Sequence, residues 1–218
     1  MIVMITGAAG GIGSKTAEYF LAKGHEVHGL DVAPSAVTHE CYTHHIADVT
    51  DPATYPEGIV PEVLVNCAGV QESGKDVEVN LLGTIRVTER FAITNPDIRA
   101  VVNVGSASGH TGSEFPEYAA SKGGVLAYTK NAALRLAPRA TCNSIDPGGV
   151  TTELNRCVMD DPELWAKIME QTPLKRWASP EEIAEWIYFV AVNNRFMTGQ
   201  NLLIDGGEAG RAEFVWPE

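Results

Sequence analysis

A tyrosine and a lysine four residues apart are the side chains in this sequence whose types and spacing best suit chemistry. Tyr118 and Lys122 lie in a stretch with a helical pattern, so both side chains fall on one face of a helix. An ammonium group beside a phenol lowers the pKa of the phenol, which allows Tyr118 to give or take a proton near neutral pH. The same spacing also arises by chance on exposed helices, so the pair needs support from elsewhere.

Ser106 supplies a hydroxyl group directly after a predicted strand, Ala100–Val104. At that place a serine can orient the oxygen of a substrate. A lone serine after a strand is more often a turn residue. Only the combination with Tyr118 and Lys122 therefore points to an active site.

A glycine-rich turn, residues 6–13 with the sequence TGAAGGIG, follows the first predicted strand and opens the first predicted helix. Glycines permit the tight turn and let the backbone approach a pyrophosphate at the helix N-terminus. The sequence of the turn matches the motif TGxxxGxG through Gly7, Gly11 and Gly13. It also fits TGxxGxxG through Gly10, so the turn alone does not choose between branches of dinucleotide-binding proteins.

Asp31 closes the second predicted strand, where a carboxylate can accept hydrogen bonds from both ribose hydroxyls of a dinucleotide. The same charge repels a 2′-phosphate. Gly10 precedes Gly11, so no basic residue is available there to bind that phosphate. These residues favour NAD over NADP; the alternative is that Asp31 is a solvated acid at a strand end.

Short apolar runs alternate with helical patterns, which predicts a doubly wound parallel α/β sheet of the Rossmann type in one domain, residues 1–218. The predicted strands are Met1–Ile5, His25–Leu30, Val63–Val65, Ala100–Val104, Ala140–Ile145 and Asn201–Ile204. The predicted helices are Gly13–Lys23, Val77–Ile93, Glu117–Leu136 and Pro180–Val192. Thr50–Pro61 carries three prolines and predicts at most a turn. Residues 151–178 are irregular and form either a mobile substrate lid or a plain connector.

The composition excludes several classes of protein. A net charge of −12 argues against a nucleic-acid partner, because phosphate binding needs a basic face. No apolar run approaches the roughly 18 residues of a membrane span. The four cysteines have no CxxC or ligand-like spacing. We therefore expect reduced thiols in a cytoplasmic protein, with no metal site and no membrane partner.

Further motifs occur in a familiar order between Ile2 and Gly207. They are Asp48-Val49, NCAG at 66–69, Asn80 in VNLLGT, YAASK at 118–122, NSIDPGGVTT at 143–152, PEEIA at 180–184 and IDGG at 204–207. With them the sequence closely resembles the short-chain dehydrogenase/reductase family, in its short single-domain branch. The IDGG ending, the short length and Asn80 resolve the glycine ambiguity in favour of that branch.

The resemblance implies roles for individual residues. Tyr118 would be the acid/base, and Lys122 would bind the nicotinamide ribose and lower the pKa of Tyr118. Ser106 would bind the substrate oxygen, and Asn80 would hold a water of the proton relay. The implied cofactor-binding residues are Gly7, Gly11, Ile12, Gly13, Asp31, Asp48, Val49, Asn66, Ala68, Gly69, Tyr118, Lys122, Pro147, Gly148, Val150 and Thr152. The substrate residues are Ser106, Ser108, His110, Tyr118, Gly149 and Leu154.

The chain departs from the family pattern in two ways that bear on the site. It is shorter between Val49 and Asn66 and between Gly69 and Asn80, so the helices of one flank must be truncated or lost. Asp146 stands where a small neutral residue is usual. We interpret it as a hydrogen-bonded structural acid; the alternatives are that it tunes the site electrostatically or selects a polar substrate. His110 is interpreted as a surface-loop residue, or else as one that points into the substrate cleft.

The sequence therefore predicts an NAD-dependent oxidoreductase that interconverts a secondary alcohol and a ketone. A likeness to 3α-hydroxysteroid dehydrogenase/carbonyl reductase relatives suggests a hydroxysteroid or another cyclic alcohol. The alternatives are a 3-oxoacyl reductase, a sugar or polyol dehydrogenase and, more remotely, a non-catalytic NAD-sensing protein. The resemblance also implies a homodimer or homotetramer.

Overall fold

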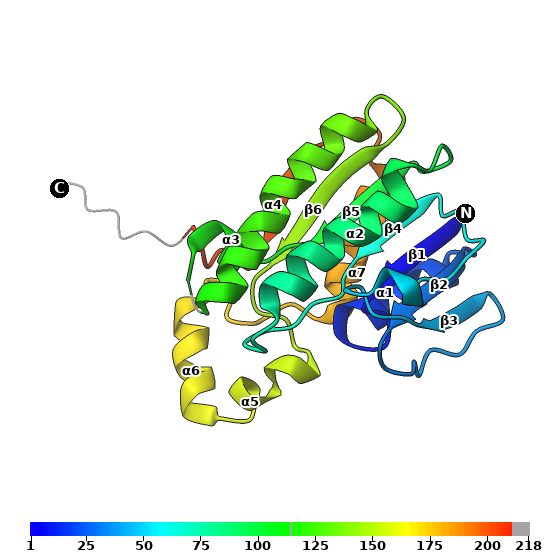
Figure 1. The fold of residues 1–218 in the computed structure, drawn as a ribbon. Coiled ribbons are helices and arrows are strands. Elements are labelled where there is room, and N and C mark those ends of the chain that lie inside the picture. The colour runs from blue at the N-terminus through cyan, green and yellow to red at the C-terminus, as the bar shows by residue number, and fades with distance from the viewer. Residues whose placement is uncertain (114, 211–218) are drawn as a thin grey trace.

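The computed structural model describes residues 1–113 and 115–210, and seven strands of these residues form one parallel sheet (Figure 1). The strands lie in the order β3-β2-β1-β4-β5-β6-β7. The chain moves outward from β1 in one direction and then returns to β4 beside it. In such open sheets the crevice for a ligand forms where the order reverses, at the carboxyl ends of the strands. The bounds are β1 Ile2–Thr6, β2 Glu26–Asp31, β3 Tyr42–Ile46, β4 Val63–Asn66, β5 Ala100–Val104, β6 Thr141–Pro147 and β7 Asn201–Ile204.

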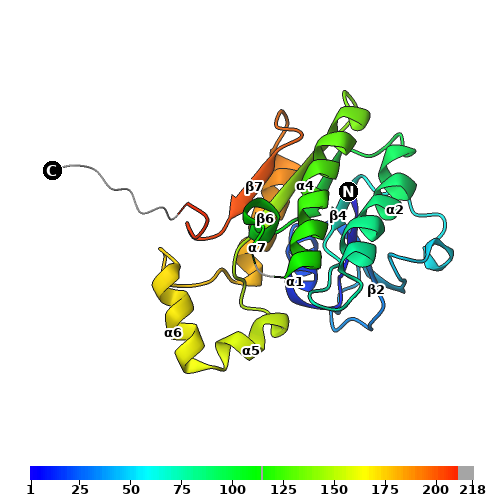
Figure 2. The same ribbon diagram turned by 60° about the vertical axis from the view of Figure 1, so that its left-hand side comes forward.

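Helices cover both faces of the sheet, as Figure 2 shows from a second side. On one face lie α1 (Gly11–Ala22) and α7 (Pro180–Tyr188), the latter continued by a π-helical turn, η5 (Phe189–Asn193). On the other face lie α4 (Pro116–Leu136) and a continuous helix built of η2 (Val77–Gly83), α2 (Thr84–Thr88) and η3 (Glu89–Ile93).

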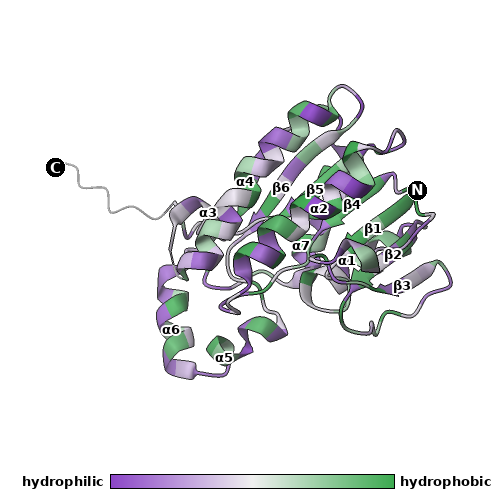
Figure 3. Cartoon of the chain, in the orientation of Figure 1, coloured by the Kyte–Doolittle hydropathy of each residue, from purple (hydrophilic) through white to green (hydrophobic). Residues whose placement is uncertain are grey.

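The burial of β1 on both faces of the sheet explains why the central strands are unbroken apolar runs in the sequence. Val3, Met4 and Ile5 are all fully buried. Successive side chains alternate between the two faces, so Val3 and Ile5 join the core under α1 and α7. Met4 joins the core under α2 and α4. Figure 3 shows the resulting hydrophobic centre and the more polar outer helices.

The predicted fold class is confirmed, and every predicted strand and helix is present within a few residues of its predicted bounds. The Val77–Ile93 helix has those limits, although part of it is π-helical. The prediction missed β3, whose side chains are mostly polar and of which none is buried. It also missed three helices, α3 (Ala107–Thr111), α5 (Arg156–Met159) and α6 (Pro162–Gln171).

One flank of the sheet is shortened, as the sequence predicted. The fully described stretch 47–62 between β3 and β4 contains one short 3-10 turn, η1 (Pro52–Thr54). The connection 32–41 joins β2 directly to β3, with no helix among its described residues. Ile46 is therefore 62% exposed on the edge strand.

Residues 151–178 leave the body of the domain and return to it. Val150 pairs with Ala178 as an isolated β-bridge, which closes the base of this segment. All its residues are described, and none in η4 (Glu153–Asn155), α5 or α6 is buried. Both views show α5 and α6 standing away from the sheet (Figures 1 and 2). Among the described residues, no helix has the length and apolar character needed to cross a membrane.

Candidate active site

The glycine-rich turn between β1 and α1 is shaped by contacts that leave no room for side chains. Gly7 has φ +68°, and a Cβ placed on it would lie 2.7 Å from the Ala68 nitrogen. A Cβ on Gly13 would lie 2.1 Å from the Gly7 carbonyl oxygen. The helix that follows begins without a side-chain cap. Its first N–H groups can therefore bind a pyrophosphate.

Thr152 closes the turn from the opposite side. A Cβ on Gly11, whose φ is +50°, would contact Thr152 Cγ2 at 3.5 Å. The start of the 151–178 segment thus lies against the glycine-rich turn, although the two are distant in the sequence. Ile12 packs partly buried against the core below. The shape and the donors of this turn fit a dinucleotide.

Asp31 lies at the carboxyl end of β2 beside the same turn. Its Oδ2 accepts a hydrogen bond from the Ala9 amide at 3.0 Å, and its Oδ1 accepts one from the Ala33 amide at 3.0 Å. A carboxylate has about four acceptor positions, so both oxygens retain capacity for ribose hydroxyls. The two amides fix the orientation in which those positions are presented.

The neighbouring residues Asp48 and Val49, predicted to bind the cofactor, are held by local contacts. Asp48 Oδ1 accepts hydrogen bonds from the amide and the hydroxyl of Thr50, which lower the pKa of Asp48. Val49 contacts Gly83, where a Cβ would lie 2.7 Å from its Cγ2. Val49 thus packs the shortened flank against the start of α2.

Tyr118 and Lys122 occupy one face of α4, as their spacing predicted. The Lys122 ammonium lies 5.7 Å from the centroid of the Tyr118 ring. Lys122 is only 5% exposed, and its Nζ donates to the carbonyl oxygen of Val104 at 2.9 Å. The ammonium is thus buried, fixed by the end of β5 and held beside the Tyr118 ring.

Asn80 connects the end of β4 to α4. Its Oδ1 accepts from the Val70 amide at 2.8 Å, and its Nδ2 donates to the Val70 carbonyl and to Ser121 Oγ. A Cβ on Gly69 would lie 3.3 Å from Asn80 Oδ1 and 3.5 Å from Lys122 Nζ. The structure thus brings together three parts of the predicted site that are distant in sequence. Ser121 itself was not predicted, although it directly precedes Lys122 in the YAASK motif.

Asn66 and Ala68 shape the floor between β4 and the turn. Asn66 is 3% exposed and donates to Thr88 and Asn103, while its Oδ1 has no partner among the described residues. The Ala68 amide donates to Thr6 Oγ1. Burial raises the pKa of the Cys67 thiol to about 12, which makes this cysteine unreactive at neutral pH.

Ser106 is the N-cap of α3, where its Oγ accepts a hydrogen bond from the Ser108 amide at 3.1 Å. A hydroxyl that accepts in this way keeps its own proton for another acceptor. Both serines are largely buried, with 8% and 6% of their surface exposed. The cap therefore fixes Ser106 in one orientation.

The predicted nicotinamide loop follows β6. The Gly148 amide donates to the Ile204 carbonyl, so β7 anchors the loop. The backbone at Gly149 lies against the indole of Trp177, where a Cβ would approach the ring to 2.0 Å. Val150 is 4% exposed in the core, and Pro147 ends β6. Leu154, predicted to face the substrate, is 60% exposed on η4.

His110 and Asp146 form a hydrogen-bonded pair, with 2.7 Å between Nε2 and Oδ2. His110 belongs to α3, so its interpretation as a loop residue was wrong. The interpretation of Asp146 as a hydrogen-bonded acid agrees with the geometry. Burial raises the pKa of Asp146, and the hydrogen bond from His110 opposes that rise.

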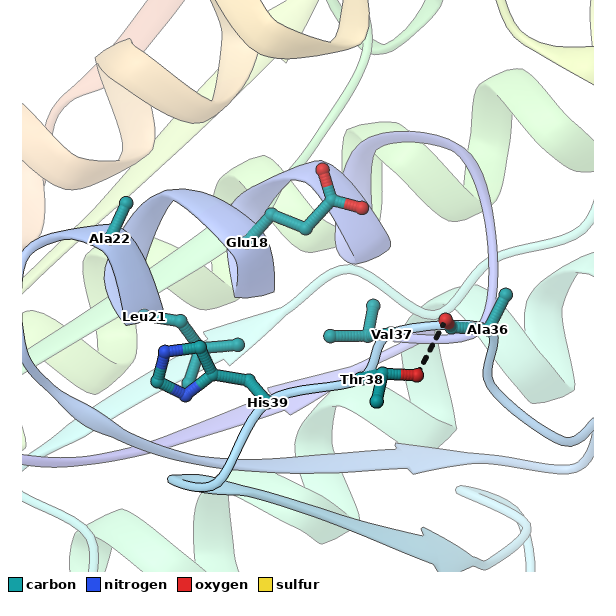
Figure 4. Close-up of a pocket in the computed structure, with 7 residues that line it drawn as sticks. All are labelled: Glu18, Leu21, Ala22, Ala36, Val37, Thr38 and His39. Carbon is teal, nitrogen blue, oxygen red and sulfur yellow. Dashed lines mark hydrogen bonds between the residues drawn. The ribbon is translucent and has the colours of Figure 1, made fainter.

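A cavity of about 290 Å³ lies on the outer side of α1, next to the 36–39 part of the β2–β3 connection (Figure 4). Glu18 and Leu21 line it from the helix and Val37 and His39 from the connection. None of these residues belongs to the predicted site. Among the described residues there is also no group of His, Cys, Asp and Glu suited to a metal ion.

Comparison with known proteins identifies the family. Residues 62–208 match a family model described as enoyl-(acyl carrier protein) reductase. The chain belongs to the short-chain dehydrogenase/reductase family. It is therefore an oxidoreductase that acts on CH–OH groups or the corresponding carbonyls.

Two curated relatives align over nearly the whole chain. The 3-oxoacyl-(acyl-carrier-protein) reductase FabG of Salmonella typhimurium is 30% identical over 94% of this chain and 96% of its own. Galactitol 2-dehydrogenase (L-tagatose-forming) of Cereibacter sphaeroides is 32% identical over 93% of this chain and 92% of its own. These relatives differ in substrate, so similarity alone does not name the alcohol.

Two solved structures carry nicotinamide cofactors. 4-Hydroxyisoleucine dehydrogenase complexed with NADH is 28% identical, with a TM-score of 0.86 over 97% of this chain and 99% of that one. A putative 2-deoxy-D-gluconate 3-dehydrogenase from Agrobacterium tumefaciens with bound NADP is 26% identical, with a TM-score of 0.88 over 96% of each chain. These neighbours support a nicotinamide cofactor for this fold without distinguishing the two forms.

Proposed function

We propose that this protein is an NAD-dependent dehydrogenase/reductase that interconverts a secondary alcohol and a ketone. The observation that carries the proposal is the buried Lys122 ammonium, which is fixed on the Val104 carbonyl beside the Tyr118 ring. The presence of all four predicted side chains, Asn80, Ser106, Tyr118 and Lys122, argues against a non-catalytic NAD-sensing protein.

The nicotinamide ring, when bound, accepts or supplies the hydride. The residues of this chain manage the proton and the geometry. In oxidation, the Tyr118 phenolate takes the proton of the substrate hydroxyl, and in reduction the phenol returns it to the carbonyl oxygen. Lys122 stabilises the phenolate by its charge. Ser106 donates its hydroxyl proton to the substrate oxygen, and Asn80 supports the path by which Tyr118 exchanges protons with solvent.

The preference for NAD is argued from Asp31, whose carboxylate is oriented by two amides at the ribose end of the turn. A 2′-phosphate at this place would meet a negative charge, and Gly10 offers no compensating cation. We expect kcat/KM with NAD to exceed that with NADP by at least about tenfold. Asp31→Asn should reduce this ratio, and an unchanged ratio in the variant would refute the role of the charge.

The substrate we propose is a hydroxysteroid or another cyclic secondary alcohol. A sugar or polyol is the second candidate, and the 32% identical galactitol 2-dehydrogenase favours it. A 3-oxoacyl thioester is the third, and the 30% identical 3-oxoacyl reductase favours that one.

We also propose that residues 151–178 act as a lid over the substrate, because η4, α5 and α6 contain no buried residue.

The purified protein should be screened with steroid, cyclic, polyol and 3-oxoacyl substrates, each with both cofactors. Tyr118→Phe is the decisive variant. It should lower kcat by about 10²–10⁴-fold, because it removes the acid/base group, while NADH binding changes little. Full turnover in Tyr118→Phe would refute the mechanism. Sedimentation of the same preparation tests the proposed homodimer or homotetramer.

A further inference from the structure

The His110 imidazole and the Asp146 carboxylate form a pair that the reaction described above does not use. Asp146 is 0% exposed, whereas 29% of the His110 side chain is exposed. A buried carboxylate is costly unless hydrogen bonds or a charge compensate for its lost hydration. His110 supplies that compensation through the hydrogen bond of 2.7 Å.

The pair meets the catalytic side chains at the end of β5. Lys122 Nζ binds the carbonyl oxygen of Val104. On the next residue, a Cβ at Gly105 would lie 2.1 Å from Asp146 Oδ1, so the carboxylate occupies the space that a side chain would fill. The ammonium and the carboxylate therefore contact two consecutive residues of one strand end. Burial raises the pKa of Asp146, and the charge of Lys122 is among the effects that oppose this rise.

The pair also joins two elements that carry predicted site residues. His110 lies in α3, whose N-cap is Ser106. Asp146 lies in β6, immediately before Pro147 and the nicotinamide loop. The hydrogen bond thus ties the helix of the substrate-binding serine to the strand that leads to the cofactor.

We propose that His110 and Asp146 are a positioning pair for the reaction, holding α3 against β6 and placing a negative charge behind Lys122 whenever His110 is neutral. The proposal rests on the proposed function, since that charge acts on Tyr118 through Lys122. The charged group that faces the pair from α4 is Lys122, and the one from α3 is His110 itself. Protonation of His110 makes the pair neutral overall.

The sign of the effect follows from electrostatics. A negative charge near Lys122 partly cancels the ammonium and so opposes formation of the Tyr118 phenolate. Removing the charge should therefore let Tyr118 ionise at lower pH. A pair that served only to hold α3 in place would change activity or stability without moving this ionisation.

The ionisation of Tyr118 can be followed without a known substrate. Near-ultraviolet absorbance is recorded against pH for each protein and for the same protein carrying Tyr118→Phe, and the difference isolates Tyr118. We expect Asp146→Asn to lower the midpoint by about half a pH unit or more. His110→Gln keeps a hydrogen-bond donor and leaves the carboxylate in place, so its midpoint should stay within about 0.2 units of wild type. Glu185→Gln, which removes an exposed carboxylate on α7, is the control.

Because Asp146 is fully buried, Asp146→Asn can also disturb the fold. His110→Ala changes a partly exposed side chain and therefore provides an independent test. Truncation of His110 opens the Asp146 carboxylate to water, which weakens the interaction of its charge with Lys122, so the midpoint should fall toward that of Asp146→Asn. Identical midpoints in wild type, His110→Ala and His110→Gln would overturn the proposal. If Tyr118→Phe remains fully active, the proposed function fails. If Tyr118→Phe is inactive and the midpoints do not move, only the role of the pair fails.

Discussion

The surroundings of Tyr118 and the segment 151–178 meet at the carboxyl edge of the sheet, but they are held in different ways. Asn80, Ser106 and Lys122 are 1%, 8% and 5% exposed, and each makes a hydrogen bond to the backbone. The described segment has no buried residue in η4, α5 or α6. The bridge between Val150 and Ala178 and the edge-to-face contact of Trp165 with Trp177 hold its base.

This difference in burial suits the two regions to different tasks. The reacting groups must keep distances within a fraction of an ångström, and buried polar networks provide that rigidity. A segment with few buried contacts opens at low free-energy cost, which suits the entry and release of a substrate. Substitutions in the first region should therefore affect rate and stability, whereas substitutions in the second should affect substrate binding.

The largest effect should come from the ammonium in the rigid region. Lys122→Ala removes both the charge beside Tyr118 and the bond to Val104, and we expect kcat/KM to fall by about 10³-fold or more. Lys130→Ala, on an exposed position of the same helix, should leave kcat/KM unchanged. Steady-state kinetics with either cofactor form measure kcat/KM. Equal losses of kcat/KM in the two variants would contradict the role of Lys122.

Truncating one aromatic side chain in the core below the site and one in the segment 151–178 tests the contrast in packing directly. Phe91 is 1% exposed in the core, so Phe91→Ala should lower the free energy of unfolding by about 3–5 kcal/mol. Trp165→Ala should cost about 1 kcal/mol or less and should raise KM for the substrate instead. Urea denaturation measures the free energy of unfolding of each variant, and steady-state kinetics measure KM. A large stability loss in Trp165→Ala would show that the segment is part of the core.

Two glycines of the nucleotide turn offer a matched pair. Gly13→Ala would place a Cβ 2.1 Å from the Gly7 carbonyl oxygen, whereas no atom lies within 4 Å of a Cβ on Gly10. We expect Gly13→Ala to destabilise the fold by about 1–3 kcal/mol and to weaken NADH binding. Gly10→Ala should bind NADH like wild type. NADH fluorescence titration distinguishes them, and equal affinities would show that the turn tolerates displacement.

The smallest effect concerns the junction of the segment 151–178 with α7. Arg176 at the end of the segment donates two hydrogen bonds of 2.7 Å to Glu182 in α7. These bonds and the bond from the Ser179 amide lower the pKa of Glu182 to about 2 from 4.5. A depressed carboxyl pKa stabilises the fold above pH 4.5, and this contribution disappears as the pH falls through 2.

Glu182→Gln retains the capping role at α7 and removes only the charge. Because the ion pair is exposed, the variant should melt only about 1 °C below wild type at neutral pH. The two melting temperatures should converge near the pH at which Glu182 is protonated in the folded state. A difference that persists unchanged at low pH would rule out an electrostatic origin.

Most of the fold could be predicted because burial imposes readable patterns. The apolar runs of β1, β4 and β5 reflect a sheet covered on both faces. The Ser179–Pro180 start of α7 is a capping box in the structure, with reciprocal bonds between Ser179 and Glu182. The meeting of Gly69, Asn80 and Lys122 follows once the strand order is known.

The rest could not be predicted because its determinants are not local patterns. β3 pairs in parallel with β2, yet its sequence, YTHHI, lacks the apolar alternation of a half-buried strand. α6 has no buried residue, and the signals for it in the sequence are the N-cap Asp161 and Pro162 at its start. The pairing of His110 with Asp146 joins residues 36 positions apart, and only the three-dimensional structure reveals it.

The direct connection from β2 to β3 has a consequence for how the molecule folds. Closing a short loop costs less conformational entropy than closing a long one, so pairing across residues 32–41 needs little of the chain to be ordered first. β6 and β7, in contrast, pair only after residues 148–200 are arranged between them. We expect the polar edge of the sheet to acquire protected amides early in refolding, while β7 closes the opposite edge late.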